Sequence, residues 1–267
     1  MVTVAPKNAV ILAAGRGSRL RPLTDLRPKP LVEVNGTSIL HNALRNLEAV
    51  GVEEVTIVVG YRKDAIQYAC GSRFGQINIK YVESTVFERT GSAYSLWLAR
   101  DALLCGDCFL LEGDVFFEED ALRYLIGCGG TDVAAVVPFD DSMEGSAVLL
   151  SQNGFITGFR LKQTASDLVA NGPRLFKTMN LLRLSAPTLK ATIVPTLDDI
   201  ISAGARQTYT EELFGYLIEK RDLRLSAARC DGLSWYEIDN AEDLQIAERI
   251  FRGRTNAYAP RRDLQTR

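Results

Sequence analysis

Histidine is almost absent from the sequence, since His41 is the only one in 267 residues, and cysteine occurs five times. An odd number of cysteines argues against a framework of disulfides. A four-ligand zinc site usually takes two closely spaced pairs of Cys or His, and the chain contains one such pair and a single His. Cys105 and Cys108 have CxxC spacing, but without a second such pair we interpret them as part of a turn before an apolar strand. We therefore expect reduced thiols, and we interpret His41 as a packing or surface residue of a helix.

Long apolar runs and strong net charge are missing as well. No run reaches the roughly 20 residues that a membrane-spanning helix needs, and the opening MVTVAPKN has neither the apolar region nor the cleavage site of a signal peptide. The net charge is only -2, so the chain as a whole does not attract nucleic acid or an anionic membrane. We expect a cytoplasmic protein whose binding charge is local; a homodimer is one option that the sequence leaves open.

The first half alternates apolar runs with helical patterns. Strands joined through helices of about a dozen residues predict right-handed crossovers and a mostly parallel, doubly wound (Rossmann-like) α/β sheet with helices on both faces. In such sheets ligands bind beyond the carboxyl ends of the strands, where Gly15, Thr90 and Asp114 fall. The expected strands are 9–13, 54–60, 77–83, 108–114 and 131–138, and the expected helices are 38–51, 62–72, 92–104 and 118–127.

The second half is less regular and predicts a small appended β/α lid region. It begins with a hairpin over 145–162 that turns at Asn153-Gly154. No linker rich in Pro, Gly or Ser and no internal repeat divides the chain. We therefore expect one domain over 1–252 and a mobile tail over 253–267. The further expected elements are strands at 173–185, 222–228 and 233–239, and helices at 186–205, 210–221 and 241–251.

The segment 15–29, GRGSRLRPLTDLRPK, combines two glycines with a concentration of positive charge directly after the first strand. Gly15 and Gly17 leave backbone N–H groups open to an anion. The segment is not a P-loop, because Gly17 is followed by Ser and Arg, and it is not the dinucleotide fingerprint, because Leu20 stands where a third glycine belongs. Asp25 is the only acid among its cations, and a triphosphate suits that charge. The cations are Arg16, Arg19, Arg21, Arg27 and Lys29.

The segments LAAGRGSRLRPLT (12–24) and PKPLVEVNG (28–36) together resemble the signature of nucleotidyltransferases that join a phosphorylated small molecule to a nucleotide, such as the sugar-1-phosphate nucleotidylyltransferases. The resemblance continues through LLEGDVFF (110–117) to WYEIDNAEDLQIAE (235–248). TGSAYSLWLARD (90–101) is similar to the cytidylyltransferases that act on phosphocholine and on 2-aminoethylphosphonate. FKTMNLLRLS (176–185) resembles a strand of the phosphonate branch, from which Met179 and Leu182 depart.

This resemblance implies a nucleotidyltransferase domain with Mg²⁺ as cofactor, CTP as donor and a small phosphonate or phosphate ester as acceptor. It implies catalytic roles for Lys29 at the α-phosphate, Arg19 at the β- and γ-phosphates and Lys177 at the acceptor, and it places the metal on Asp114 and Asp239. The implied nucleotide-binding residues are Leu12, Ala13, Ala14, Gly15, Arg16, Gly17, Ser18, Arg19, Lys29, Thr90, Gly91 and Ser92. The implied acceptor-binding residues are Lys177, Asn180, Trp235 and Glu237.

Strand alternation supports part of this assignment, because in LSWYEID (233–239) it puts Trp235, Glu237 and Asp239 on one face. An aromatic ring and a carboxylate beside a metal ligand suit a cationic amine. The alternatives are an exposed Trp–Glu pair at a sheet edge and, for Asp239, an N-cap of the following helix. Asp114 would then only cap a turn.

The expected reaction is attack by a phosphate or phosphonate oxygen on the α-phosphorus of CTP. A phosphate monoester is largely ionised at neutral pH, so the nucleophile needs no general base, which fits a chain with one histidine. One alternative is a sugar-1-phosphate nucleotidylyltransferase that uses another nucleoside triphosphate. A second, of another class, is a catalytically silent nucleotide-binding subunit, which has no need of Lys29, Asp114 and Asp239 together.

Overall fold

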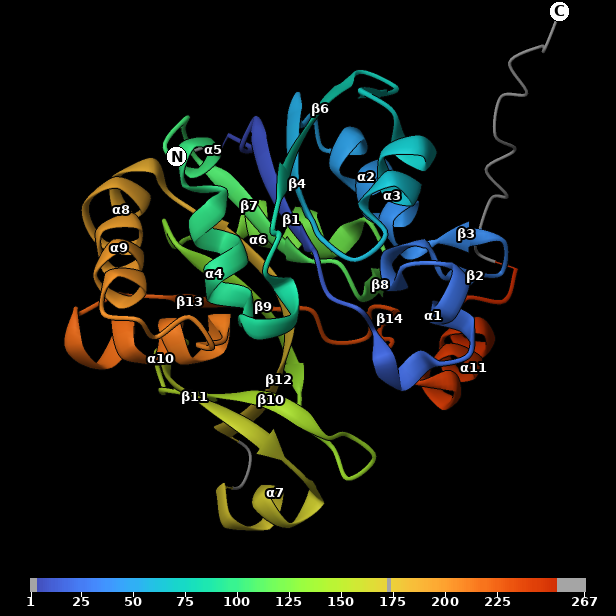
Figure 1. The fold of residues 1–267 in the computed structure, drawn as a ribbon. Helices are drawn as coiled ribbons and strands as arrows, with labels where there is room; N and C mark the ends of the chain where they lie inside the picture. Colours follow the sequence, from blue (N-terminus) through green and yellow to red (C-terminus); the bar gives the residue numbers. More distant parts are fainter. Residues whose placement is uncertain (1–3, 172–173, 254–267) are drawn as a thin grey trace, which may run out of the picture.

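A computed structural model describes residues 4–171 and 174–253, in which a ten-stranded mixed sheet runs through the molecule (Figure 1). Its centre is four parallel strands in the order β7-β1-β4-β6. β1, β4 and β7 form from short, apolar runs that are almost entirely buried, as parallel strands usually are, whereas β6 alternates buried with exposed residues over its first half. Their bounds are β1 Asn8–Ala13, β4 Glu54–Val59, β6 Ile77–Glu83 and β7 Cys108–Glu112.

Helices cover both faces of this centre, which confirms the predicted α/β class. Alternate side chains of β1 divide between two cores: Ile11 packs with the helices of one face, and Val10 and Leu12 pack with those of the other. The first face carries α2 Ile39–Ala49, α3 Lys63–Cys70 and α6 Asp120–Gly127. The second face carries α4 Ser92–Leu98, α5 Arg100–Leu103, α9 Val194–Ser202 and α10 Thr210–Lys220.

One strand from the second half of the chain, β12 (Leu175–Leu184), enters the sheet antiparallel beside β7. It also pairs antiparallel with β9 (Val133–Pro138). The sequence pattern predicted a mostly parallel sheet, so this antiparallel pairing of β9 was not expected. The register between β12 and β9 shifts between Thr178 and Leu182, and Asn180 inside that bulge has φ 53°. Asn tolerates this left-handed conformation better than most residues, and bulges commonly redirect the side chains next to them.

The predicted hairpin is present as β10 (Gly145–Leu150) and β11 (Ile156–Gln163), with Gly154 at φ 77° in the turn. It extends the main sheet through β12 and, with α7 (Ala165–Asn171), forms the lower projection in Figure 1. The helix α7 was not predicted, although Thr164 and Asp167 form a capping pair at its start that the sequence TASD signals.

The rest of the second half follows the prediction with local differences. The helix predicted at 186–205 is divided into α8 (Ala186–Thr188), a π-helical turn (Leu189–Ile193) and α9. Pro195 lies just after that turn and cannot donate to a carbonyl of the preceding turn, which accounts for the widening. The strand predicted at 222–228 begins later, as β13 (Ser226–Arg229), and the helix predicted at 92–104 breaks at Ala99 between α4 and α5.

Smaller elements complete the described structure. A two-stranded sheet pairs β14 (Trp235–Glu237) with β8 (Val115–Phe117), and α11 (Ala241–Ile250) follows. The remaining pieces are α1 Leu23–Leu26, β2 Glu33–Val34, β3 Thr37–Ser38 and β5 Arg73–Phe74. The tail predicted at 253–267 falls, apart from Gly253, outside the described residues.

The cysteine and histidine predictions agree with the structure. Cys108 is fully buried, which raises the pKa of its thiol to about 12, and Cys105 is exposed. His41 stacks on Phe74, and burial lowers the pKa of its imidazole. Within the described residues, no helix is both long enough and apolar enough to cross a membrane.

Candidate active site

The loop after β1 returns on itself and is held by its own contacts. Gly17 has φ 64°, and a Cβ there would lie 2.6 Å from Cβ of Lys29, so only glycine leaves room for the lysine side chain to pass beneath the loop. Thr24 Oγ1 donates to the Gly17 carbonyl at 2.8 Å. The stem of Lys29 is therefore fixed against the backbone that is expected to bind phosphate.

Tyr61 braces this loop from the neighbouring strand end, a role that the sequence did not reveal. Its backbone N–H donates to the Ala14 carbonyl at 3.0 Å. Its hydroxyl donates to the carbonyl of Thr24 at 3.0 Å and contacts that of Asp25 at 3.3 Å. The guanidinium of Arg16 lies 5.5 Å from the centre of its ring, a cation–π distance. The loop is thus tied down at both ends before any ligand binds.

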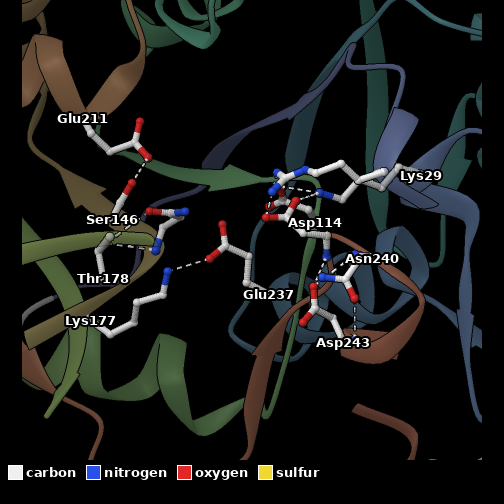
Figure 2. A network of polar contacts seen from close by, with 12 residues as sticks. Lys29, Asp114, Ser146, Lys177, Thr178, Glu211, Glu237, Asn240 and Asp243 are labelled. Atoms are coloured by element: carbon white, nitrogen blue, oxygen red, sulfur yellow. Dashed lines mark hydrogen bonds and ion pairs between the residues drawn. The ribbon is translucent and has the colours of Figure 1, made fainter. Parts of the chain in front are cut away.

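Lys29, Asp114 and Asp239 meet at the carboxyl ends of the strands, as predicted. The Lys29 ammonium donates to Asp114 at 2.9 Å and to Asp239 at 2.6 Å, and Figure 2 shows Lys29 reaching Asp114 from the loop side. Burial by itself would lower the pKa of Lys29, but the two carboxylates outweigh it and raise that pKa above its usual range. Lys29 therefore stays charged at neutral pH.

Asp239 belongs to this cluster and is not the cap of α11. The cap is Asn240, whose side chain accepts from Glu242 N at 2.8 Å and from Asp243 N at 3.1 Å. Asp243 in turn accepts from the backbone N–H of Asp239 at 2.9 Å. Burial favours the neutral form of Asp239, yet Lys29 and Arg19 hold the pKa of its carboxyl below the ordinary value. The alternative that Asp239 serves as a helix N-cap is therefore wrong.

The donor set at Asp114 and Asp239 fits Mg²⁺. Oδ1 of Asp114 is buried without a hydrogen-bond partner in the described structure, and such an orphaned oxygen suits a cation. No group of three or more His, Cys, Asp or Glu side chains in residues 4–171 and 174–253 is arranged to hold a metal. Two carboxylates are what Mg²⁺ commonly takes from a protein when phosphates and waters supply the remaining oxygens.

Lys177 and Glu237 form a second, partly buried ion pair beside the first cluster. Lys177 lies on β12, is 4% exposed, and donates to Glu237 at 2.7 Å. Figure 2 shows Glu237 between Lys177 and Asp114. Burial raises the pKa of Glu237 despite the opposing charge of Lys177. The β12 bulge holds Asn180 close by, where Thr178 Oγ1 donates to its Oδ1 at 3.2 Å.

The segment 90–92 lies against the loop between α9 and α10. Gly91 N donates to the Arg206 carbonyl at 2.8 Å, and Ala93 N to the Thr208 carbonyl at 3.2 Å. Ser92 Oγ accepts from the backbone N–H of Thr210 at 2.9 Å. A Cβ on Gly91 would lie 2.2 Å from the Thr208 carbonyl oxygen. The predicted base-binding segment is therefore positioned by a loop that follows it by more than a hundred residues.

Gly91→Ala is expected to destabilise the protein by about 2 kcal/mol or more, because backbone would have to move to admit the methyl group. It should also weaken nucleotide binding, since the shift falls on 90–92. Gly127→Ala is the matched control, since a Cβ at Gly127 meets nothing within 4 Å. Thermal unfolding and nucleotide titration of both variants test this, and equal stability of the two would contradict it.

Sequence reasoning missed a pair of carboxylates, Glu112 and Glu211, which line a small cavity together with Asn180. Thr210 Oγ1 donates to Glu112 at 2.7 Å, and Ser146 Oγ donates to Glu211 at 2.8 Å. Burial and repulsion from Glu211 raise the pKa of Glu112 well above its ordinary value. The available signal was a glutamate inside the otherwise apolar run LLEGD, which is unusual for a buried strand.

Other predicted residues lie around these clusters with less specific contacts. Leu12 and Ala13 end β1, Ala14 follows it directly, and all three are buried. Arg16 also pairs with Glu88 at 3.5 Å, and Thr90 Oγ1 donates to the Val86 carbonyl at 3.2 Å. Three predicted residues remain. Gly15 and Ser18 are exposed on the loop, and Trp235 is half-buried against the main core.

Residues 9–174 match the family described as the MobA-like NTP transferase domain. The chain belongs to this family. The match covers the loop 15–29, the segment 90–92 and Asp114, and it ends before Lys177 and Asp239. The resemblance to nucleotidyltransferases stated from the sequence is therefore confirmed.

Within the family, two similar relatives are named for phosphonate chemistry. The CMP-5'-(3-aminopropyl)phosphonate synthase of Streptomyces rubellomurinus is 33% identical over 249 residues, which is 92% of this chain and 39% of that protein. The 2-aminoethylphosphonate cytidylyltransferase of Lancefieldella rimae is 36% identical over 113 residues, 42% of this chain and 45% of that protein. The chain thus spans less than half the length of these two curated relatives.

A solved structure shows the same fold. The CTP:phosphocholine cytidylyltransferase from Streptococcus pneumoniae superposes with a TM-score of 0.73 at 22% identity, over 91% of this chain and 98% of that one. This similarity extends past residue 174, so the second half of the chain, with β12 and β14, belongs to the same architecture.

Proposed function

We propose that the chain is a Mg²⁺-dependent cytidylyltransferase that transfers CMP from CTP to a small phosphonate or phosphate monoester and releases pyrophosphate. The observation that carries this is the meeting of Lys29, Asp114 and Asp239 beside the Lys177–Glu237 pair. The names of the two phosphonate-related relatives support CTP as donor and an aminoalkylphosphonate as acceptor. Phosphocholine, a phosphate monoester, and hydroxyethylphosphonate, a small phosphonate, are further acceptors that the proposal includes.

In this proposal, residues of the braced loop bind the donor. Backbone N–H groups around Gly15 and Gly17 and the side chains of Arg16 and Arg19 hold the triphosphate. Lys29 stabilises the charge that develops at the α-phosphate in the transition state. Thr90, Gly91 and Ser92 contact the base.

The acceptor lies on the β12 side. Lys177 neutralises the phosphonate dianion, Asn180 supports it, and Glu237 with Trp235 receives the cationic end. An acceptor oxygen forms a bond to the α-phosphorus while the bond from that phosphorus to the bridging oxygen breaks, and pyrophosphate leaves with the electron pair. The acceptor oxygen is already ionised, so no proton has to be removed. Asp114 and Asp239 would hold Mg²⁺, which neutralises phosphate charge during transfer.

A pyrophosphate-release screen tests this function. CTP, UTP, GTP and dTTP are each combined with 2-aminoethylphosphonate, hydroxyethylphosphonate, phosphocholine and glucose 1-phosphate. The expected result is turnover with CTP and a phosphonate or phosphocholine. Faster turnover with glucose 1-phosphate and another triphosphate would instead support the sugar nucleotidylyltransferase alternative, and nucleotide binding without turnover would support the silent subunit.

A further inference from the structure

The Lys29 ammonium lies between the same two carboxylates to which the metal is assigned. It is 2.9 Å from Oδ2 of Asp114 and 2.6 Å from Oδ1 of Asp239. Arg19 contacts the other oxygen of Asp239 at 2.9 Å from an exposed side chain. In the described structure, therefore, the charge of both carboxylates is balanced by protein cations, chiefly by Lys29, whose side chain is 12% exposed.

We propose that in the free protein Lys29 competes with the divalent cation for Asp114 and Asp239 and leaves them when the cation binds. This rests on the metal role that the proposed function gives to the two carboxylates. Lys29 contacts Oδ2 of Asp114, whereas the oxygen without a partner is Oδ1 of the same carboxylate. An ammonium and a dication on the two oxygens of one partly buried carboxylate repel each other, so the two cations compete for the pair of aspartates.

The position of its stem limits where the Lys29 ammonium can move. Its stem passes directly beneath Gly17, where a Cβ would lie 2.6 Å from Cβ and 3.2 Å from Cδ of the lysine. With the stem fixed there, rotation about the terminal bonds of the side chain moves the ammonium from the carboxylates toward the loop amides. An ammonium that leaves two anions needs another anion, and the triphosphate on that loop provides it.

It follows that nucleotide and metal bind interdependently. A nucleotide that draws Lys29 onto its phosphates frees the carboxylates, and a metal that displaces Lys29 makes it available to phosphate. Because such coupling is reciprocal, each should strengthen the binding of the other. The metal alone should bind the free protein weakly.

The test measures Mn²⁺ binding without nucleotide or acceptor, from the free Mn²⁺ signal in electron paramagnetic resonance. Lys29→Met is expected to bind Mn²⁺ about 10-fold or more tightly than the wild type, since it removes the competing cation. Lys80→Met is the control: it also removes a paired lysine, whose partner is Glu54 at 2.7 Å and which contacts neither Asp114 nor Asp239, and its effect should stay below about 3-fold. Unchanged or weaker binding by Lys29→Met overturns the proposal, as does equal tightening by Lys80→Met.

Two further measurements keep the result interpretable. If Lys29→Met is poorly stable, its Tm should still rise more with Mn²⁺ than that of the wild type, and an equal or smaller rise counts against the proposal. Asp114→Asn added to Lys29→Met should abolish the gain; a retained gain overturns the proposal because it places the metal elsewhere. The Mn²⁺ binding measurement contains neither CTP nor acceptor. Its outcome is therefore independent of which donor and acceptor the pyrophosphate screen identifies.

Discussion

Asp239→Asn is expected to lower kcat by about 10²- to 10³-fold and to raise the Mg²⁺ concentration needed for activity. An amide is a weaker Mg²⁺ ligand than a carboxylate, and the substitution also removes a negative charge that offsets the dication. The fold should be retained, because Lys29 keeps Asp114 as its partner and α11 keeps Asn240 as its cap. Steady-state kinetics at varied Mg²⁺, together with thermal unfolding, measure both effects.

Asn240, the neighbour of Asp239, provides the control, because its substitution should affect stability and not activity. Asn240→Ala removes the cap of α11 and should cost about 1 kcal/mol of stability while leaving most of the activity. If Asp239→Asn instead keeps wild-type kcat at limiting Mg²⁺, the ligand assignment is wrong and the second carboxylate must come from elsewhere, with Glu237 the nearest candidate.

Lys177→Met is expected to raise the KM for the acceptor by about 10²-fold or more while changing the KM for CTP only a few-fold. A buried ammonium facing a phosphonate dianion supplies binding that a thioether cannot replace. Stability should fall as well, because Glu237 is left in a shielded position without its partner at 2.7 Å.

A double variant separates these two consequences. Lys177→Met with Glu237→Gln removes the unpaired charge, so it should recover much of the stability, but the acceptor KM should remain high. Kinetics with each substrate varied in turn, and unfolding curves for the three proteins, provide the comparison. An unchanged acceptor KM in a folded Lys177→Met protein would show that this lysine is only a structural partner of Glu237.

The sequence predicted the central strands and the loop after β1 because both depend on local pattern. Apolar runs such as AVILA (9–13) indicate buried parallel strands, and glycines followed by arginines indicate an anion-binding loop. Family resemblance added Lys29, Asp114 and Asp239, and the structure brings these three together.

Contacts between distant segments could not be read from local pattern. Lys29 finds partners 85 and 210 positions away, and only the folded topology sets those distances. Alternation predicts that 173–185 is a strand but does not identify its neighbours, so the antiparallel insertion of β12 was not predicted. Asp239 and Asn240 are equally good N-cap residues by propensity, and the choice between them depends on where β14 ends.

The position of β12 also divides the site along the chain. The loop 15–29, the segment 90–92 and Asp114 all precede residue 174, where the match to the family ends, whereas Lys177, Asn180 and Glu237 follow it. Because β12 enters the sheet directly beside β7, this later segment reaches the cluster of Lys29 and Asp114 without altering the loop 15–29, to which the proposed function assigns the nucleotide. Under that proposal, substitutions in the later segment can change the acceptor while donor binding stays constant, with the exception of Asp239, which lies in the later segment but serves the metal.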